Sequence, residues 1–93
     1  DNPEGYAILA RTYRELGRFD EAAAAFRRLI ELAPSADAYS GLGEVLTGAR
    51  NGLVGDEAHE AMVNALVLDR EEPRARFYLG LEQAGKGNPQ GAI

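Results

Sequence analysis

The chain lacks the residues on which several kinds of site depend. It has no Cys among 93 residues, which excludes disulfides and cysteine-bound metal sites. It has a single histidine, His59, so histidine-rich metal clusters are excluded as well, and we expect no metal and no cofactor. Lys and Arg number 10 against 15 Asp and Glu, for a net charge of −5. Because the phosphate backbone of a nucleic acid is also negative, we do not expect nucleic-acid binding.

Long apolar runs are missing too. No run approaches the ~20 residues needed to span a bilayer, and the sequence shows no signal peptide. It begins with Asp1 and not with Met, so we expect a segment of a longer protein. A hydrophobic content of 45% with 27% charged residues is typical of a folded chain, and the length suits one domain.

What is present is a repeated helical spacing. In residues 6–34 the positions that define it are Tyr6, Leu9, Ala10, Tyr13, Gly17, Phe19, Ala22, Phe26, Leu29 and Pro34. This spacing is typical of the 34-residue tetratricopeptide repeat, which is a pair of antiparallel helices. Ala10 and Ala22 are small where the two helices approach each other. Gly17 favours the left-handed backbone that ends the first helix, and Pro34 ends the second.

The pattern then recurs. Tyr39, Leu42, Gly43 and Leu46 repeat the first-helix positions 33 residues later, whereas the second-helix positions recur 36 residues later, at Ala58, Met62 and Ala65. The two offsets indicate a longer turn near residues 48–55. A third copy begins with Leu79 and Gly80.

The prediction is therefore an all-α fold, a tetratricopeptide-repeat superhelix of antiparallel helix pairs. Residues 1–93 form one such domain of about two and a half repeats, at about 3–35, 36–71 and 73–93, with the last repeat truncated. We expect helices near 3–16, 20–33, 36–48, 56–69 and 73–85, and a sixth that starts near Pro89. Because this sixth helix is cut short, the face of the fifth helix that would receive it should be poorly covered.

Catalytic patterns are weak, and we expect no enzyme. Ser40 lacks the first Gly of a nucleophile elbow and the strand before it. Residues 80–87 match the phosphate-loop spacing until Gly87, which stands where Ser or Thr must bind magnesium. His59 is expected to be solvated or locally bonded, and the charged run 70–74 is expected to be a solvated turn between repeats.

A binding surface is what remains. In this repeat the first helix of each pair lines the concave side of the superhelix. The candidate peptide-binding residues at its groove positions are Glu4, Ala7, Arg11, Arg14, Ser40, Glu44, Thr47, Arg74, Phe77 and Leu81, with Asp37 and Ala84 at equivalent positions. The groove becomes apolar towards Phe77 and Leu81, so it suits an amphipathic helix. The alternative for Phe77 and Tyr78 is inward packing, and the sequence leaves open which of them faces the groove.

Several stretches resemble the CcmI/CycH family of c-type cytochrome biogenesis proteins. The resemblance covers essentially the whole chain. The resembling stretches are residues 66–81, the long turn at 51–54 and the ending at 87–93, and the more specific parts are the string Arg-Ala-Arg-Phe-Tyr-Leu-Gly within 66–81 and the Gly-rich turn. The chain departs from the family pattern at Arg70, where Pro is common, at Gly55-Asp56, where Thr-Pro is common, and at Arg76, where an aromatic is common.

The resemblance implies a periplasmic domain that is tethered to the inner membrane by a segment outside this chain. It implies a chaperone-like, non-catalytic binder that holds the C-terminal helix of apocytochrome c and presents it to the subunits of the haem-ligation complex. The absence of Cys fits this role, because the domain could form no mixed disulfide with the thiols of its client.

Two other binding functions compete with this one. A clamp for a C-terminal carboxylate would place Lys and Asn on the first helix of each repeat, but those slots hold Ala7, Arg11, Gly41 and Tyr78, with only Arg74 cationic in the expected place. We therefore disfavour it. The remaining alternative is a generic repeat scaffold that docks a partner protein in a multi-subunit complex.

Overall fold

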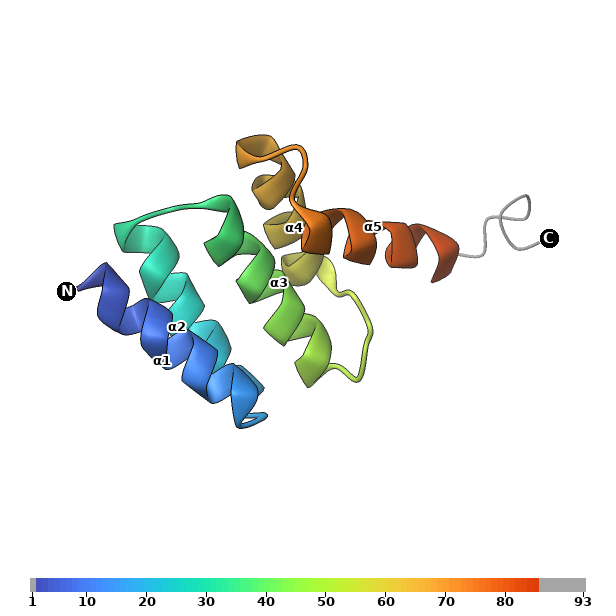
Figure 1. Cartoon of the computed structure of the whole chain (residues 1–93). Coiled ribbons are helices and arrows are strands. Elements are labelled where there is room, and N and C mark those ends of the chain that lie inside the picture. The colour runs from blue at the N-terminus through green and yellow to red at the C-terminus, as the bar shows by residue number, and fades with distance from the viewer. Residues whose placement is uncertain (1, 86–93) are drawn as a thin grey trace.

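The computed structural model describes residues 2–85 and, within them, five helices and no strand (Figure 1). The helices are α1 (Pro3–Glu15), α2 (Phe19–Leu32), α3 (Ala36–Ala49), α4 (Asp56–Leu68) and α5 (Pro73–Gly85). Each predicted helix is present, with ends within one residue of the expected ones. The predicted sixth helix lies outside the described residues.

Local signals explain where the helices begin and end. The Asn2 side chain accepts a hydrogen bond from the Glu4 N–H at 3.0 Å, and Pro3 occupies the first turn of α1, where its missing N–H is not needed. Gly17 has φ 76° and turns the chain after α1. Ser35 caps α3 through the Ala38 N–H, also at 3.0 Å. Such caps typically contribute about 1 kcal/mol each.

The helices pack as two successive pairs followed by α5. Consecutive helices contact each other, and α5 also contacts α3 (Figure 1). The core of the first pair and of its junction with the second contains small residues around the Phe26 ring: Ala10, Ala22 and Val45 are fully buried, and Phe26 is nearly so. This confirms the prediction that Ala10 and Ala22 mark a close approach.

Two glycines of α3 let its neighbours come close. A Cβ on Gly41 would lie 2.5 Å from the Phe26 ring of α2, and one on Gly43 would lie 2.6 Å from the end of the Met62 side chain of α4. Real Cβ atoms do not approach other atoms so closely. Gly41 therefore sets the spacing between the first pair and the second, and Gly43 sets the spacing within the second pair.

Leu9 does not have the burial that its position in the pattern suggests. It is 44% exposed, whereas Leu42, at the same position of the next repeat, is 6% exposed. The difference follows from the stacking, because Leu42 is covered by the helices of the first pair and no described element lies beyond α1. Leu9, Tyr6 and Tyr13 instead line a shallow apolar hollow together with residues of α2.

Candidate functional site

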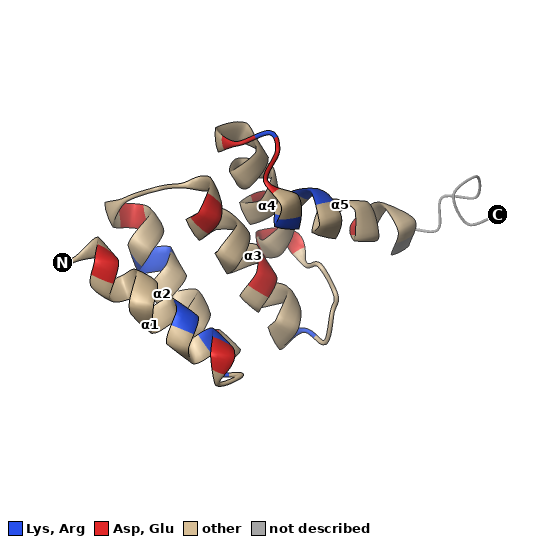
Figure 2. Ribbon diagram, in the orientation of Figure 1, with Lys and Arg blue, Asp and Glu red and all other residues tan. Residues whose placement is uncertain are grey.

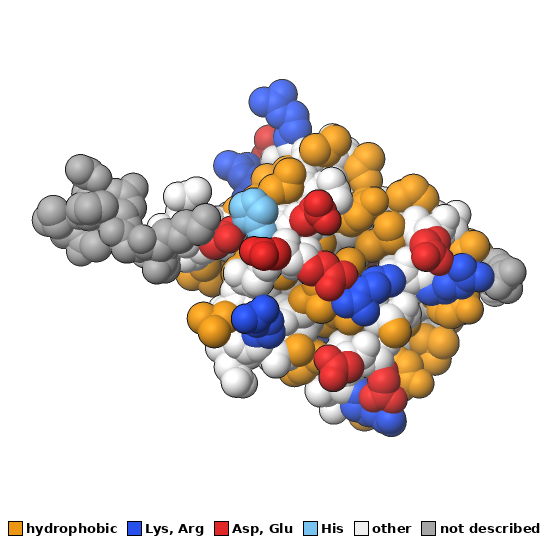
Figure 3. Space-filling view, turned by 180° about the vertical axis from the view of Figure 1, so that it is seen from behind, with side chains coloured by type: hydrophobic (Ala, Val, Ile, Leu, Met, Phe, Trp, Pro, Cys, Tyr) orange, Lys and Arg blue, Asp and Glu red, His pale blue; other side chains and the backbone are white. Residues whose placement is uncertain are grey.

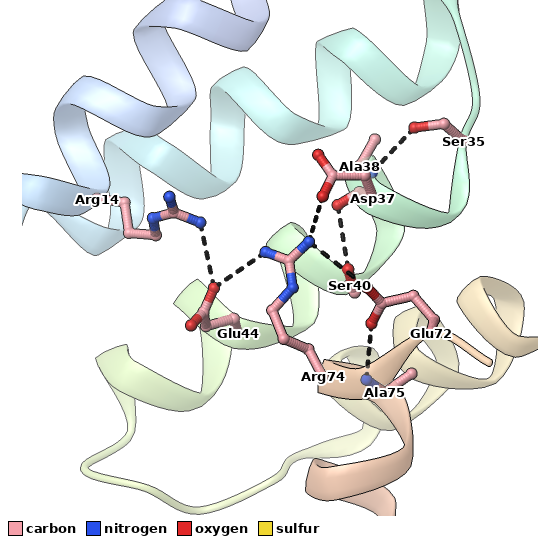
Figure 4. Close-up of polar contacts among 9 residues, drawn as sticks. All are labelled: Arg14, Ser35, Asp37, Ala38, Ser40, Glu44, Glu72, Arg74 and Ala75. Atoms are coloured by element: carbon pink, nitrogen blue, oxygen red, sulfur yellow. Dashed lines mark hydrogen bonds and ion pairs between the residues drawn. The ribbon is translucent and has the colours of Figure 1, made fainter. Parts of the chain in front are cut away.

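An ion-pair cluster joins the three first helices, α1, α3 and α5. Arg14 of α1 donates to Glu44 of α3 at 3.2 Å, and Arg74 of α5 donates to the same Oε1 atom at 3.3 Å (Figure 4). Arg74 also binds Asp37 of α3. Figure 2 shows the resulting arrangement of charge, with acidic positions on α3 between basic positions on α1 and α5. The cluster ties these helices together on one side of the molecule.

The position of Arg74 is fixed by its surroundings. Burial is the largest influence on the pKa of its guanidinium and lowers it, but Asp37, Glu72 and Glu44 together raise this pKa above its ordinary value. Glu72 is 7% exposed. Its Oε1 accepts the Ala75 N–H at 2.9 Å at the start of α5, and its other oxygen lies 3.7 Å from Arg74 (Figure 4).

The prediction that residues 70–74 form a solvated turn is thus wrong for two of these residues. Glu72 and Arg74 are structural parts of the cluster, and only the rest of the run is exposed. The signal for Glu72 was present in the sequence, since an acidic residue directly before a helix-starting proline is well placed to accept a first-turn N–H.

An exposed apolar stripe continues from the cluster along α5. Phe77 and Leu81 are 61% and 47% exposed, and they lie three and seven residues after Arg74, so all three share a helix face. Tyr78 turns the other way, onto the buried cluster of Met62, Ala65 and Ala75. The structure therefore answers which of the two aromatic residues is available to a partner: it is Phe77.

Burial raises the pKa of Tyr78, with a further rise from Glu44, which agrees with its inward position. The Phe77 and Tyr78 rings meet edge to face with centroids 5.4 Å apart. Tyr78 thus supports the exposed Phe77 ring from beneath.

Two of the predicted groove residues are wrong as contact residues. Ser40 is fully buried, with its hydroxyl donating to the Asp37 carbonyl, and Thr47 is 3% exposed. The physical reason is the central position of α3, which is contacted by α2, α4 and α5. The other candidates reach the surface, fully or partly: Glu4, Ala7, Arg11, Arg14, Glu44, Arg74, Phe77 and Leu81, together with Asp37 and Ala84.

The structure brings seven residues together around a small cavity of about 230 Å³ between α1, α2, α3 and α5. Four of them were candidates for the groove, namely Ala7, Arg11, Arg14 and Arg74, and Asp37 stood at an equivalent position. Phe26 and Leu29 complete the cavity. Sequence reasoning placed these two in the core alone, because the periodicity of one helix does not show that its inner face also reaches a cavity.

The residues considered for catalysis have other hydrogen-bond partners. Nδ1 of His59 contacts Glu82 of α5, and Ser35 and Ser40 bond to their own helix. Among residues 2–85, no group of three or more acidic or histidine side chains is placed to hold a metal ion. None of the described helices combines the length and apolar character needed to cross a membrane.

The opposite side of the molecule is seen from behind in Figure 3, where acidic, basic and apolar side chains are interspersed over the surface. A bidentate ion pair joins Arg27 of α2 to Glu57 of α4 at 2.8 and 2.9 Å. On α4, Val63 and Val67 are exposed beside Arg70 around a shallow depression.

Comparisons with known proteins agree with this fold. The family model for the tetratricopeptide repeat matches residues 3–36. The chain is 43% identical over 91 residues to "Cytochrome c-type biogenesis protein CycH" of Rhizobium meliloti, covering 91% of this chain and 24% of that protein. It is 36% identical over 92 residues to the protein of the same name from Bradyrhizobium diazoefficiens, covering 96% of this chain and 25% of that protein. No solved structure matches.

The chain therefore spans about a quarter of the length of the curated relatives it matches. Over nearly all of its own length it resembles them, and it carries the repeat pattern with the helices that this pattern predicts. It is a tetratricopeptide-repeat segment homologous to part of the CycH (CcmI) cytochrome c-type biogenesis proteins.

Proposed function

We propose that this chain is a non-catalytic binding module of cytochrome c maturation that holds the C-terminal helix of an apocytochrome c for haem attachment. The observation that carries the proposal is the exposed pair Phe77 and Leu81, which continues the ion-pair cluster along one face of α5. The homology of the chain to the CycH proteins is the reason for proposing cytochrome c maturation as the pathway. Subunits of the haem-ligation complex are the expected further partners.

The geometry suits an amphipathic helix as the ligand. Phe77 and Leu81 are one helical turn apart, so they present adjacent apolar anchors. An apolar ligand face that covers them would gain about 1–3 kcal/mol for each side chain it removes from water. The charged cluster beside them, at Arg74 and Glu44, would lie along the polar edge of the ligand. Apolar anchors with a polar rim are typical of helix-in-groove recognition.

In this proposal the module works in the periplasm and is tethered to the inner membrane in the full-length protein. The absence of Cys is consistent with this role. A domain that holds a client with free haem-binding thiols remains unreactive toward them when it has no thiol of its own.

Calorimetric titration with synthetic C-terminal helical peptides of c-type cytochromes tests the proposal. We expect micromolar or tighter binding, weakened about fivefold or more by Phe77→Ala or Leu81→Ala, because each change removes an anchor worth about 1–3 kcal/mol. Val67→Ala is the matched control, since Val67 is 74% exposed on α4 away from the stripe. Absence of binding by every such peptide would contradict the proposal.

The alternative is a generic scaffold that docks a partner protein in a complex. The apolar hollow at Tyr6, Leu9 and Tyr13 favours it, because this surface is suited to stacking against another helix. In that case cytochrome peptides would not bind. A partner complex would instead be lost on Leu9→Gln and retained in Phe77→Ala.

A further inference from the structure

The cavity between α1 and α5 has a charge opposite to that of the whole chain. Its polar lining consists of Arg11, Arg14, Arg74 and Asp37, which is three cations against one carboxylate in a chain of net charge −5. With Glu44 and Glu72 of the neighbouring cluster included, three carboxylates face the three arginines, but all three bind Arg74 or Arg14 and none of them binds Arg11. A local positive site within an acidic molecule favours a ligand group of negative charge.

The three guanidinium groups differ in how much of their bonding capacity is in use. Arg74 is held by Asp37 and Glu44. Arg14 donates one hydrogen bond, to Glu44, and an arginine has five N–H donors. Arg11 is exposed, and within the described part of the chain no hydrogen bond or ion pair occupies it. Since Arg11 and Arg14 are three residues apart on α1, their free donors are on the same side of the helix.

The size and floor of the cavity limit what enters it. About 230 Å³ has room for a side chain, but a helix with side chains is about 10–12 Å across. Ala7, Phe26 and Leu29 form apolar lining beneath the arginines, which suits the methylene stem of an acidic side chain. Arg74 borders the cavity and begins the face that carries Phe77 and Leu81, so one ligand helix could reach both places.

We infer that this cavity receives the carboxylate of a Glu or Asp side chain from the bound amphipathic helix, with Arg11 as the main donor and Arg14 as the second. The inference rests on the proposed function. It adds that the ligand helix must carry an acidic residue and that the helix binds in one orientation. The acidic residue of the ligand lies towards α1 and its apolar anchors lie towards α5.

Calorimetry on the full chain tests the inference with a cytochrome C-terminal helical peptide that contains glutamate, and with versions in which each glutamate is replaced by Gln. We expect Arg11→Gln to weaken binding of the parent peptide about tenfold or more, as for a hydrogen bond between charged groups. One Glu→Gln peptide should bind equally to wild type and Arg11→Gln. Arg70→Gln is the matched control, because it removes the same charge from an exposed site in the turn after α4.

Each outcome of this experiment either supports or overturns the inference. Coupling between Arg11 and one peptide glutamate in the double-mutant cycle supports the inference, and additive effects overturn it. If amidation of the peptide terminus alone removes the Arg11 effect, the cavity takes a terminal carboxylate and the side-chain assignment is wrong. Binding that depends on Phe77 but not on Arg11 overturns this inference and leaves the proposed function intact. No binding by any peptide overturns both.

Discussion

Replacing Gly41 by Ala tests the close approach between the two helix pairs. In an exposed helix interior this change stabilises by about 1 kcal/mol, because Ala is the better helix former. At Gly41 the new Cβ would lie 2.5 Å from two atoms of the Phe26 ring. Phe26 is 4% exposed within the core, so it has little room to move. Overpacking of this kind costs about 1–3 kcal/mol, and we expect a net loss of up to about 2 kcal/mol.

Two other glycines of the chain provide the controls. Gly80 on α5 is exposed, with no described atom within 4 Å of its added Cβ, so Gly80→Ala should raise the free energy of unfolding by about 0.5–1 kcal/mol. A Cβ on Gly43 would meet the unbranched Met62 side chain, with the terminal methyl nearest at 2.6 Å, and since such a chain adapts more easily than a ring, Gly43→Ala should fall between the two. Urea unfolding followed by circular dichroism measures all three. If Gly41→Ala stabilises the chain as much as Gly80→Ala does, the reasoning is refuted.

Three further predictions concern stability. Phe26→Ala should cost about 3–5 kcal/mol in urea unfolding, and a loss below 1 kcal/mol would show that the ring is not in the core. Leu42→Ala should cost about 2–5 kcal/mol and Leu9→Ala much less, because Leu9 is 44% exposed against 6% for Leu42; equal losses would contradict the stacking described. Hydrogen bonding to Arg27 lowers the pKa of Glu57, so this pair stabilises the chain above the ordinary pKa of about 4.3 and loses its effect as the pH falls through the lowered value. Both side chains are about half exposed, so Glu57→Gln should cost only a few tenths of a kcal/mol to 1 kcal/mol at pH 7; a cost that persisted after Glu57 is protonated would contradict this linkage.

The sequence predicts the helices closely because their ends depend on local chemistry. Asn2, Pro3, Gly17 and Ser35 act within one turn of where they stand, so no knowledge of the rest of the fold is needed. The repeat spacing adds the pairing, because it places small residues such as Ala10 where helices must meet. The division into three repeats stays a prediction, since the described residues end at Gly85.

The binding surface was only partly predictable. Position in the repeat shows which face of a first helix points inward, but it does not show how closely α5 and α4 approach α3. For this reason Ser40 and Thr47 are buried and are not part of the surface. The shared bonding of Arg14 and Arg74 to Glu44 was missed as well, because it joins residues 30 positions apart on either side. The exposure of Phe77 could not be predicted either, because it depends on Tyr78 taking the inward position.

The most direct test of a peptide-binding concave face is to locate the bound peptide. A spin label on a cytochrome C-terminal helical peptide broadens amide NMR signals of the residues near it. The account predicts attenuation at Arg11, Phe77 and Leu81, on the side of the molecule where α1 and α5 meet α3. Attenuation confined to Val63 and Val67, on the exposed face of α4, would contradict it.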